Sequence, residues 1–296
     1  MPSKTVQAHI ALFLVALIYG ANYIIAKEVM DQEYIQPLGF ILLRVLSGLV
    51  LFWLFAGFFI RKKIDWKDFP RIAACAVFGV ATNQLFFFSG LKLTTPINAA
   101  LIMTTTPMLV LVASALIIGE RITSRKVLGI LSGAAGAILL ISYGKELSFN
   151  RAQLLGDLFI FINAAAFGVY LVIVRSLMLK YHPVTVMKWV FSFGIGLVFP
   201  FGFEQVGQVD WTHFPPSIWL AVAYVLVCTT FLTYLFNAFA LKIVNPSTVS
   251  IYIYLQPLIA AILAITFAKD TFSWPKVLAA VLIFIGVHLV SRGNDQ

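Results

Sequence analysis

Hydrophobic residues along this chain are grouped into ten runs of membrane length, and short polar segments separate the runs. A hydrocarbon core about 30 Å thick requires roughly 20 helical residues, so each run predicts one membrane-spanning helix. Prolines stand at or near many of the predicted helix starts, where a missing N–H costs least. The expected spans are 7–27, 37–60, 70–91, 96–118, 126–143, 153–179, 184–203, 216–241, 246–268 and 275–291.

The second half of the chain repeats the first half at a constant offset of 150 residues. Matching pairs at this offset include Pro96 and Pro246, Pro107 and Pro257, Glu120 and Asp270, Lys126 and Lys276, and Gly136 and Gly286. Five spans fall in each copy, and an odd number places the second copy upside down in the membrane. The pattern predicts an all-α integral membrane protein with ten transmembrane helices in two inverted five-helix repeats, residues 1–146 and 147–296. That architecture is typical of secondary transporters.

Composition and charge agree with a membrane protein. Hydrophobic residues make up 61% and charged residues 11% of the chain, with a mean hydropathy of +0.96, whereas soluble domains carry about 25% charged residues. Most basic residues fall on one side of the predicted spans, so the positive-inside rule places both termini in the cytoplasm of a multi-pass cell-membrane protein, of the bacterial inner-membrane type. Topology and anionic lipid account for the net charge of +9, and nucleic acid is not an expected partner.

Several short motifs recur in an order that resembles a known repeat. The first copy contains Tyr19–Tyr23, Leu43-Arg44, Asn98–Ile102, Thr106-Pro107 and Gly119–Thr123, followed by Gly129, Gly133 and Gly136. This set is similar to the EamA-type repeat of the drug/metabolite transporter superfamily. The second copy departs from it by having Asp270-Thr271 in place of Glu120-Arg121 and by lacking the Leu-Arg pair. The resemblance implies a central cavity formed mainly by the first, third, fourth, sixth, eighth and ninth helices.

Polar side chains in the middle of a span are costly, so they should face a cavity or another helix. The repeat relates Gln84 to Tyr234 and Thr106 to Gln256, and such pairs would meet across one central site lined by amides, hydroxyls and aromatic rings. The alternative is that these groups only join helices through hydrogen bonds. The candidates for contact with a neutral or zwitterionic solute are Asn22, Tyr23, Asn83, Gln84, Phe87, Thr106, Tyr170, Tyr234, Asn237, Tyr254 and Gln256.

Pro107 and Pro257 fall within predicted spans at repeat-related positions. A proline there frees a backbone carbonyl, and paired interruptions point to a binding site with hinges; the alternative is a geometric kink. Arg44 lies about seven residues inside its span. It has a structural role there, by snorkelling to the interface or pairing helices, or it binds an anionic group of the solute. Glu120 is expected to pair locally beside Arg121, and His288 to be a packing residue.

All twelve acidic residues fall at the ends of predicted spans or outside them. Proton-driven carriers usually place a carboxylate in the path, so a facilitator or exchanger is expected. The four histidines are scattered, and no acid–base pair or metal-ligand set can be assembled, so we expect neither an enzyme nor a cofactor or metal site.

The sequence therefore predicts a secondary transporter, an exporter or exchanger of small organic metabolites such as amino acids, working by alternating access. One alternative is a nucleotide-sugar or sugar-phosphate exchanger of the same superfamily, which would require several central basic residues. The other is a membrane receptor or scaffold. Expected partners are a small-molecule solute and membrane lipid. Gly129-x-x-x-Gly133 predicts close helix packing within the fold, with a homodimer face as the alternative.

Overall fold

The computed structural model describes residues 3–31, 34–59, 64–94, 96–143, 153–266 and 273–292. Within these residues, ten helical segments are long and apolar enough to cross a membrane. They agree with the ten predicted spans, and their ends differ from the predicted ones by a few residues. The predicted repeat boundary after residue 146 lies outside the described residues.

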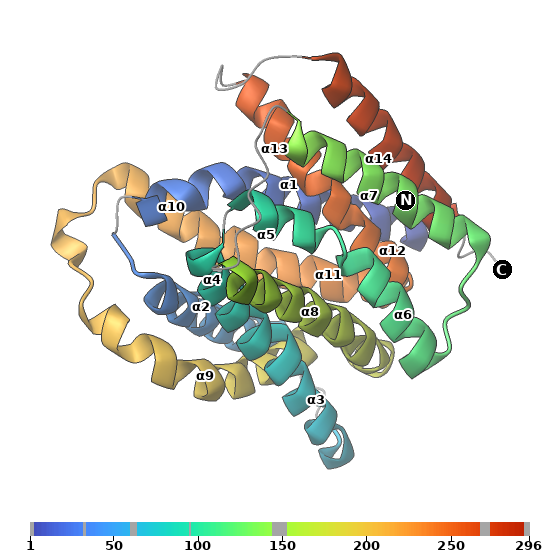
Figure 1. The fold of residues 1–296 in the computed structure, drawn as a ribbon. Coiled ribbons are helices and arrows are strands. Elements are labelled where there is room, and N and C mark those ends of the chain that lie inside the picture. The colour runs from blue at the N-terminus through green and yellow to red at the C-terminus, as the bar shows by residue number, and fades with distance from the viewer. Residues whose placement is uncertain are drawn as a thin grey trace.

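The first half contains five spans, two of which are built from several helical pieces (Figure 1). Its elements are α1 (Lys4–Asp31), α2 (Pro37–Phe59), η1 (Trp66–Asp68), α3 (Phe69–Ala76), the π-helix η2 (Val77–Thr82), α4 (Asn83–Leu93), α5 (Pro96–Met103), α6 (Thr106–Ile118) and α7 (Ser124–Ser142).

The second half repeats this order of elements. It contains α8 (Leu154–Lys180), α9 (Pro183–Gly207), η4 (Trp211–His213), α10 (Pro216–Tyr224), the π-helix η5 (Val225–Leu232), α11 (Thr233–Leu241), α12 (Pro246–Ile251), the 3₁₀-helix η6 (Tyr252–Tyr254), α13 (Leu255–Thr266) and α14 (Trp274–Arg292).

Local sequence sets several of these boundaries. Gly119 ends α6 in the left-handed conformation, with φ of 69°, which glycine adopts at little cost. Thr123 then begins α7, because its hydroxyl accepts a hydrogen bond from the Lys126 backbone N–H. Pro183, Pro216 and Pro246 each stand in the first turn of a helix, where no N–H partner is needed.

Two pairs of repeat-related helices pack directly against each other, and both pairs are antiparallel. A methyl group built on Gly129 of α7 would lie 2.7 Å from Val290, and one on Gly136 would lie 2.7 Å from the Ala279 carbonyl, so the start of α7 lies beside the end of α14. In the same way, Gly39 at the start of α2 lies against Gln205 near the end of α9. Equivalent helices that run in opposite directions establish the inverted repeat.

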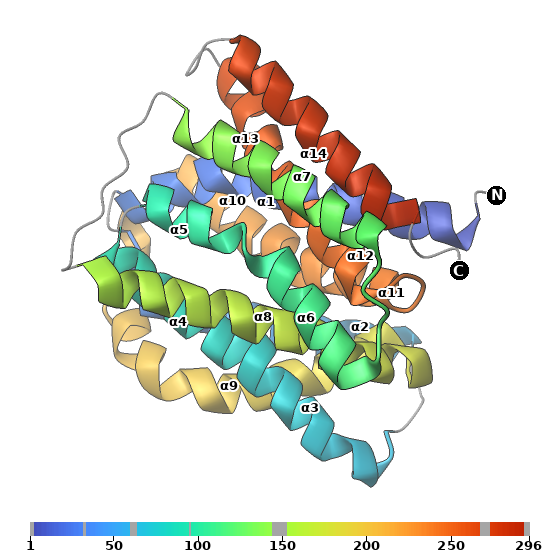
Figure 2. The same ribbon diagram turned by 45° about the vertical axis from the view of Figure 1, so that its right-hand side comes forward.

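The helical bundle has a packed interior and an apolar outer surface. Figure 2 shows the α7–α14 pair along one edge and α8 running through the middle, with α1 beginning at the same end of the molecule at which α14 ends. Large apolar side chains face outward, including Leu116 at 81% and Leu220 at 73% exposed. Such a surface fits contact with lipid rather than water.

Candidate functional site

The fourth span is interrupted where the sequence predicts it. α5 ends at Met103, and α6 begins at Thr106 with Pro107 in its first turn. The Met108 and Leu109 N–H groups both bond to the Thr105 carbonyl, so among the described residues no backbone N–H bonds the Thr104 carbonyl. The break therefore leaves a buried acceptor that requires a partner.

That partner comes from the equivalent interruption in the other half. The ninth span changes from α12 through η6 to α13, just ahead of Pro257. The hydroxyl of Tyr254, the last residue of η6, donates to the Thr104 carbonyl at 2.9 Å. The two predicted interruptions therefore exist and touch each other. Hinge motion at Pro107 and Pro257 stays a prediction.

The third and eighth spans each contain a π-helix, and η2 and η5 lie at repeat-related positions. π-Helical segments widen the helix, leave carbonyls without regular partners, and are frequent at functional sites. The Gly79 carbonyl of η2 accepts a hydrogen bond from the Tyr234 hydroxyl at 2.7 Å. A methyl group on Gly79 would lie 2.3 Å from the Tyr170 ring, so this close packing requires glycine.

Gln84, Tyr170 and Tyr234 form one group around Gly79, which we call the Tyr234 group. The Tyr170 and Tyr234 rings lie 6.2 Å apart between centroids, and Gln84 is close enough to act on the Tyr234 hydroxyl. Gln84 is 3% exposed, yet neither polar atom of its carboxamide makes a regular hydrogen bond to another described residue. The group combines an amide that makes no regular hydrogen bond to a described residue with two aromatic faces, which suits a small polar solute.

Thr106 is a second buried group without a partner. Its neighbours Thr104 and Thr105 donate their hydroxyls to backbone carbonyls of α5, whereas the Thr106 oxygen is fully buried and has no hydrogen bond among the described residues. The Asn22 side-chain oxygen of α1 is likewise buried and has no hydrogen-bond partner in the part of the chain that the structure describes. Free polar groups thus lie on three of the helices from which the sequence predicted a central site.

Other candidate residues are joined to neither of these groups by any hydrogen bond or ring contact within the described part of the chain. Phe87 packs against Phe88 and the hydrophobic core. Asn237 is buried and Gln256 is half-buried. Asn83 contributes its backbone carbonyl, which accepts from the Asn163 amide, and the Tyr23 side chain lies outside the described residues. Their contact with a solute stays a prediction.

Sequence reasoning missed one buried network and misjudged two residues. Glu120 does not pair with Arg121, whose side chain is exposed. Instead, the Lys126 ammonium donates to the Glu120 carboxylate at 2.8 Å, and both side chains are only 4% exposed. His288 is exposed rather than packed, and with His9 it lines a shallow hollow on the outer surface.

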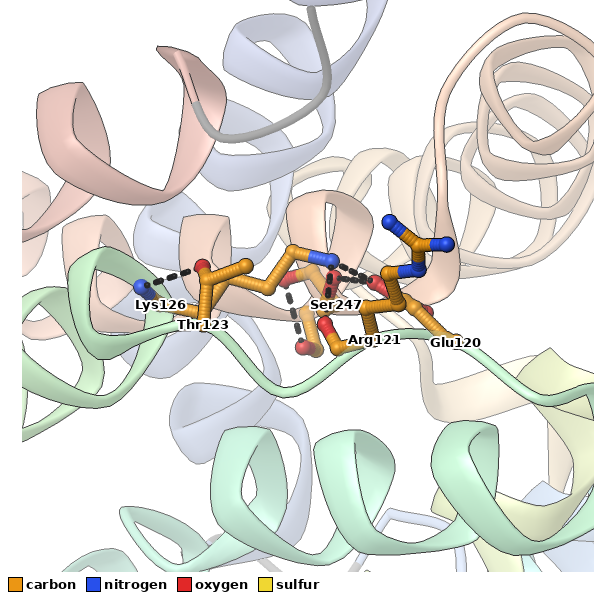
Figure 3. Close-up of polar contacts among 6 residues, drawn as sticks. Glu120, Arg121, Thr123, Lys126 and Ser247 are labelled. Carbon is orange, nitrogen blue, oxygen red and sulfur yellow. Dashed lines mark hydrogen bonds and ion pairs between the residues drawn. The ribbon is translucent and has the colours of Figure 1, made fainter. Parts of the chain in front are cut away.

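Ser247, at the start of α12, makes Glu120 a link between the two halves. Its hydroxyl donates to the same carboxylate oxygen that Lys126 bonds, and Figure 3 shows the three side chains converging between α12 and the loop that joins α6 to α7. Lys126 also donates to the Arg121 carbonyl at 3.1 Å. The sequence did signal this network, because Glu120 and Lys126 recur as Asp270 and Lys276.

Known proteins match this chain over almost all of its length. The model of the EamA-like transporter family matches twice, at residues 6–142 and 154–292. An uncharacterized transporter of Archaeoglobus fulgidus is 26% identical over 296 residues, covering 100% of both chains. The uncharacterized transporter YyaM of Bacillus subtilis is 26% identical over 292 residues, covering 97% of this chain and 94% of its own.

A solved crystal structure shows the same fold. It superposes with a TM-score of 0.80 at 20% identity, and the match covers 97% of each chain. The family model matches each half of the chain separately, and the relative from Archaeoglobus fulgidus matches from end to end. This ten-span protein therefore belongs to the EamA-like transporter family and is a multi-pass membrane transporter.

Proposed function

We propose that this chain is a secondary transporter, an exporter or exchanger, which carries small organic metabolites such as amino acids by alternating access around a central site. The observation that carries the proposal is the buried carboxamide of Gln84, both of whose polar atoms lack a regular partner within the described residues. An unsatisfied buried polar group costs about 1–3 kcal/mol. A solute that bonded this amide would remove the cost.

The contacts between the two halves support alternating access. The Glu120–Lys126–Ser247 network joins the halves at the end of the molecule where α14 finishes. Lys276 is the residue equivalent to Lys126 in the second copy, and it lies near the start of α14, at the opposite end of the molecule. We propose that the Glu120 network holds one end closed while the other end opens, and that Pro107 and Pro257 serve as hinges.

Charge distribution supports an orientation with both termini in the cytoplasm of a bacterial-type cell membrane. In that orientation, the Glu120 network closes the cytoplasmic end. The proposed partners are a small-molecule solute and membrane lipid. Gly129 and Gly133 pack against α14 within one chain, which supports the role of this motif in helix packing; a homodimer stays a prediction.

The alternatives have less support. Nucleotide sugars and sugar phosphates carry phosphate charges that call for several clustered basic side chains. Among the described residues, Arg44 bonds Thr230, one turn before Tyr234, and the buried Lys126 is engaged by Glu120. The scaffold alternative has no support from the relatives, which are named as transporters.

Proteoliposomes test the proposal. Vesicles containing purified protein would be loaded with a mixture of ¹³C-labelled amino acids, and release in exchange for external unlabelled amino acids would be followed by mass spectrometry. We expect exchange of at least one amino acid above protein-free vesicles. No exchange of any amino acid would contradict the proposed substrate class.

Matched variants locate the site in the same assay. We expect Gln84→Ala, Tyr234→Phe and Gln256→Ala to weaken apparent affinity about 5- to 150-fold, which is equivalent to 1–3 kcal/mol. The control is Ile283→Val in α14, where Ile283 is fully buried and the change should cost about 0.5–1.5 kcal/mol of stability only. If all three variants insert normally and match the control, the residues are helix-packing groups and the central site fails.

A further inference from the structure

We propose that Arg44 binds a free carboxylate of the transported solute, so that the substrate class is organic molecules with a single carboxylate, including amino acids. This inference rests on the proposed function and names the chemistry of its substrate. Arg44 lies in α2, inside the second membrane span. A cation at that depth is expensive and needs a partner.

The contacts of Arg44 point it toward the bundle. Its Nε–H donates to the Thr230 hydroxyl of η5 at 3.2 Å, and Thr230 is fully buried and donates in turn to the Val225 carbonyl. One turn further along α2, the Ser47 hydroxyl donates to the Leu226 carbonyl. The face of α2 that carries Arg44 therefore packs on η5 rather than on lipid.

Thr230 places the guanidinium beside the Tyr234 group. Thr230 and Tyr234 are four residues apart on one continuous helical path from η5 to α11, so their side chains lie on neighbouring turns of one face. The Arg44 charge is close enough to act on the Tyr234 hydroxyl. Arg44 thus bonds the helical turn that precedes Tyr234, next to the group that includes the buried Gln84 amide.

The guanidinium lacks a counter-ion in the described part of the chain. Ion pairs there join Lys126 to Glu120, Lys180 to Asp68 and His213 to Asp210, and none involves Arg44. Its one side-chain hydrogen bond to a described residue uses Nε. Arg44 is only partly buried, so its terminal N–H groups remain available to a planar, bidentate acceptor such as a carboxylate.

The charge also breaks the symmetry of the two halves. α2 begins at Pro37 and α9 at Pro183, so the residue of α9 that corresponds to Arg44 is the apolar Val190, which is fully buried. One side of the centre is therefore cationic and the other apolar. A single carboxylate matches that arrangement, and the aromatic faces of Tyr170 and Tyr234 suit an ammonium group at the other end of the same solute.

The test compares acids with their amides. Thermal unfolding would be followed for protein in phosphatidylcholine nanodiscs with a panel of amino acids and the matching amino-acid amides. We expect at least one acid to raise Tm more than its amide does. In Arg44→Gln, the apparent Kd for that acid should rise about thirtyfold or more, because a charged partner is lost in a desolvated site. Arg44→Lys should retain part of the affinity.

Arg125→Gln is the matched control, since Arg125 is exposed at the start of α7; its affinity should equal that of the wild type. The wild-type comparison of acid with amide needs no variant, so it holds even if Arg44→Gln does not fold. The proposal is overturned if amides stabilise as well as acids, if no acid stabilises, or if Arg44→Gln binds normally.

Two further measurements complete the test. One distinguishes a bound lipid from a bound solute, and the other distinguishes failure of the Arg44 proposal from failure of the transporter proposal. Because the phosphate of an anionic lipid can also bind a guanidinium, thermal unfolding would be measured again in nanodiscs that contain phosphatidylglycerol. A stabilisation by this lipid that Arg44→Gln removes, without any effect of acids, would overturn the solute assignment. Amino-acid exchange in proteoliposomes separates the two levels: normal exchange by Arg44→Gln would leave the transporter proposal standing and reject the role of Arg44.

Discussion

The Tyr254 hydroxyl donates to the Thr104 carbonyl oxygen at 2.9 Å, and these two residues are 150 positions apart, which is the length of one repeat. Each residue lies at the interruption of its own span. A second bond with the same spacing joins the Ser132 hydroxyl to the Leu282 carbonyl. Contacts between equivalent residues occur close to the pseudo-two-fold axis, so these bonds mark where the two halves meet.

The Tyr254 bond gives the first prediction. Tyr254→Phe would leave the Thr104 carbonyl without its partner, which should lower the free energy of unfolding by about 1–3 kcal/mol. Thermal unfolding in detergent would measure the change. Tyr143→Phe is the control because Tyr143 is exposed at the end of α7. Equal Tm values for the two variants would mean that the bond contributes nothing to stability.

The second prediction concerns the buried ion pair of Glu120 and Lys126. Removing one partner leaves an uncompensated charge, so Glu120→Gln or Lys126→Met alone should cost about 3–5 kcal/mol. The double variant should cost less than the sum of the two, because no charge is stranded. Unfolding curves of the four proteins form the cycle. Strict additivity would show that the two charges are not coupled.

The same network should control access to one end of the molecule. In a protein with a single added cysteine at Ser250, which is buried behind Ser247 in α12, Glu120→Gln should speed labelling by a water-soluble maleimide. Arg121→Gln provides the control, since the Arg121 side chain is exposed and outside the network. Labelling at the same rate in both variants would indicate that Glu120 does not hold this end closed.

Helix packing at Gly286 makes a further prediction. A methyl group there would lie 2.6 Å from the Gly129 carbonyl and 2.9 Å from the Gly133 Cα, and backbone atoms cannot move aside cheaply. Gly286→Ala should therefore cost about 1–3 kcal/mol. Gly196→Ala, in the interior of α9 with no atom within 4 Å, should be neutral or stabilising. Equal effects in thermal melts would contradict the close contact of α7 with α14.

The orientation of the protein in the membrane can be tested in cells. Reporter fusions should place the loop at residues 61–71 and the C-terminus in the cytoplasm, and the region after Glu204 outside. A reversed pattern would contradict the proposed orientation.

Energy coupling is a separate prediction. Because all acidic residues fall at the ends of the predicted spans or outside them, exchange of labelled solute should persist after a protonophore collapses the pH gradient. Complete loss of exchange under those conditions would reveal proton coupling.

The sequence predicted the fold well because its signals are long and periodic. Apolar runs of membrane length and prolines act on the backbone where they stand, and the constant offset shows that the two copies share one pattern. The spans and both interruptions are confirmed. The π-helices were not predicted, since an added residue in a helix leaves no compositional mark in segments such as Val77–Thr82.

Polar contacts were harder to predict than helices. The residue type does not predict the partner of a polar side chain. The Tyr234 and Tyr254 hydroxyls bond backbone carbonyls, whereas Gln84 and Thr106 make no regular hydrogen bond to a described residue. Glu120 was assigned to a neighbour in sequence because pairing with Lys126 and Ser247 depends on how the loop after Gly119 folds back. Such partners are set by tertiary structure.

The π-helix η2 also determines which way the second part of its span faces. Each residue in a regular helix advances the side-chain direction by about 100°, and the extra residue of a π-turn shifts everything that follows. If one residue were deleted within Val77–Thr82 and the span became a regular α-helix, α4 would rotate relative to α3. Gln84 would then turn away from Tyr234, although neither Gln84 itself nor any other helix had been changed. The number of residues in η2 thus helps to determine which side chains of α4 face the central site. Insertions and deletions in η2 should therefore alter substrate choice, whereas substitutions on its lipid-facing side should not.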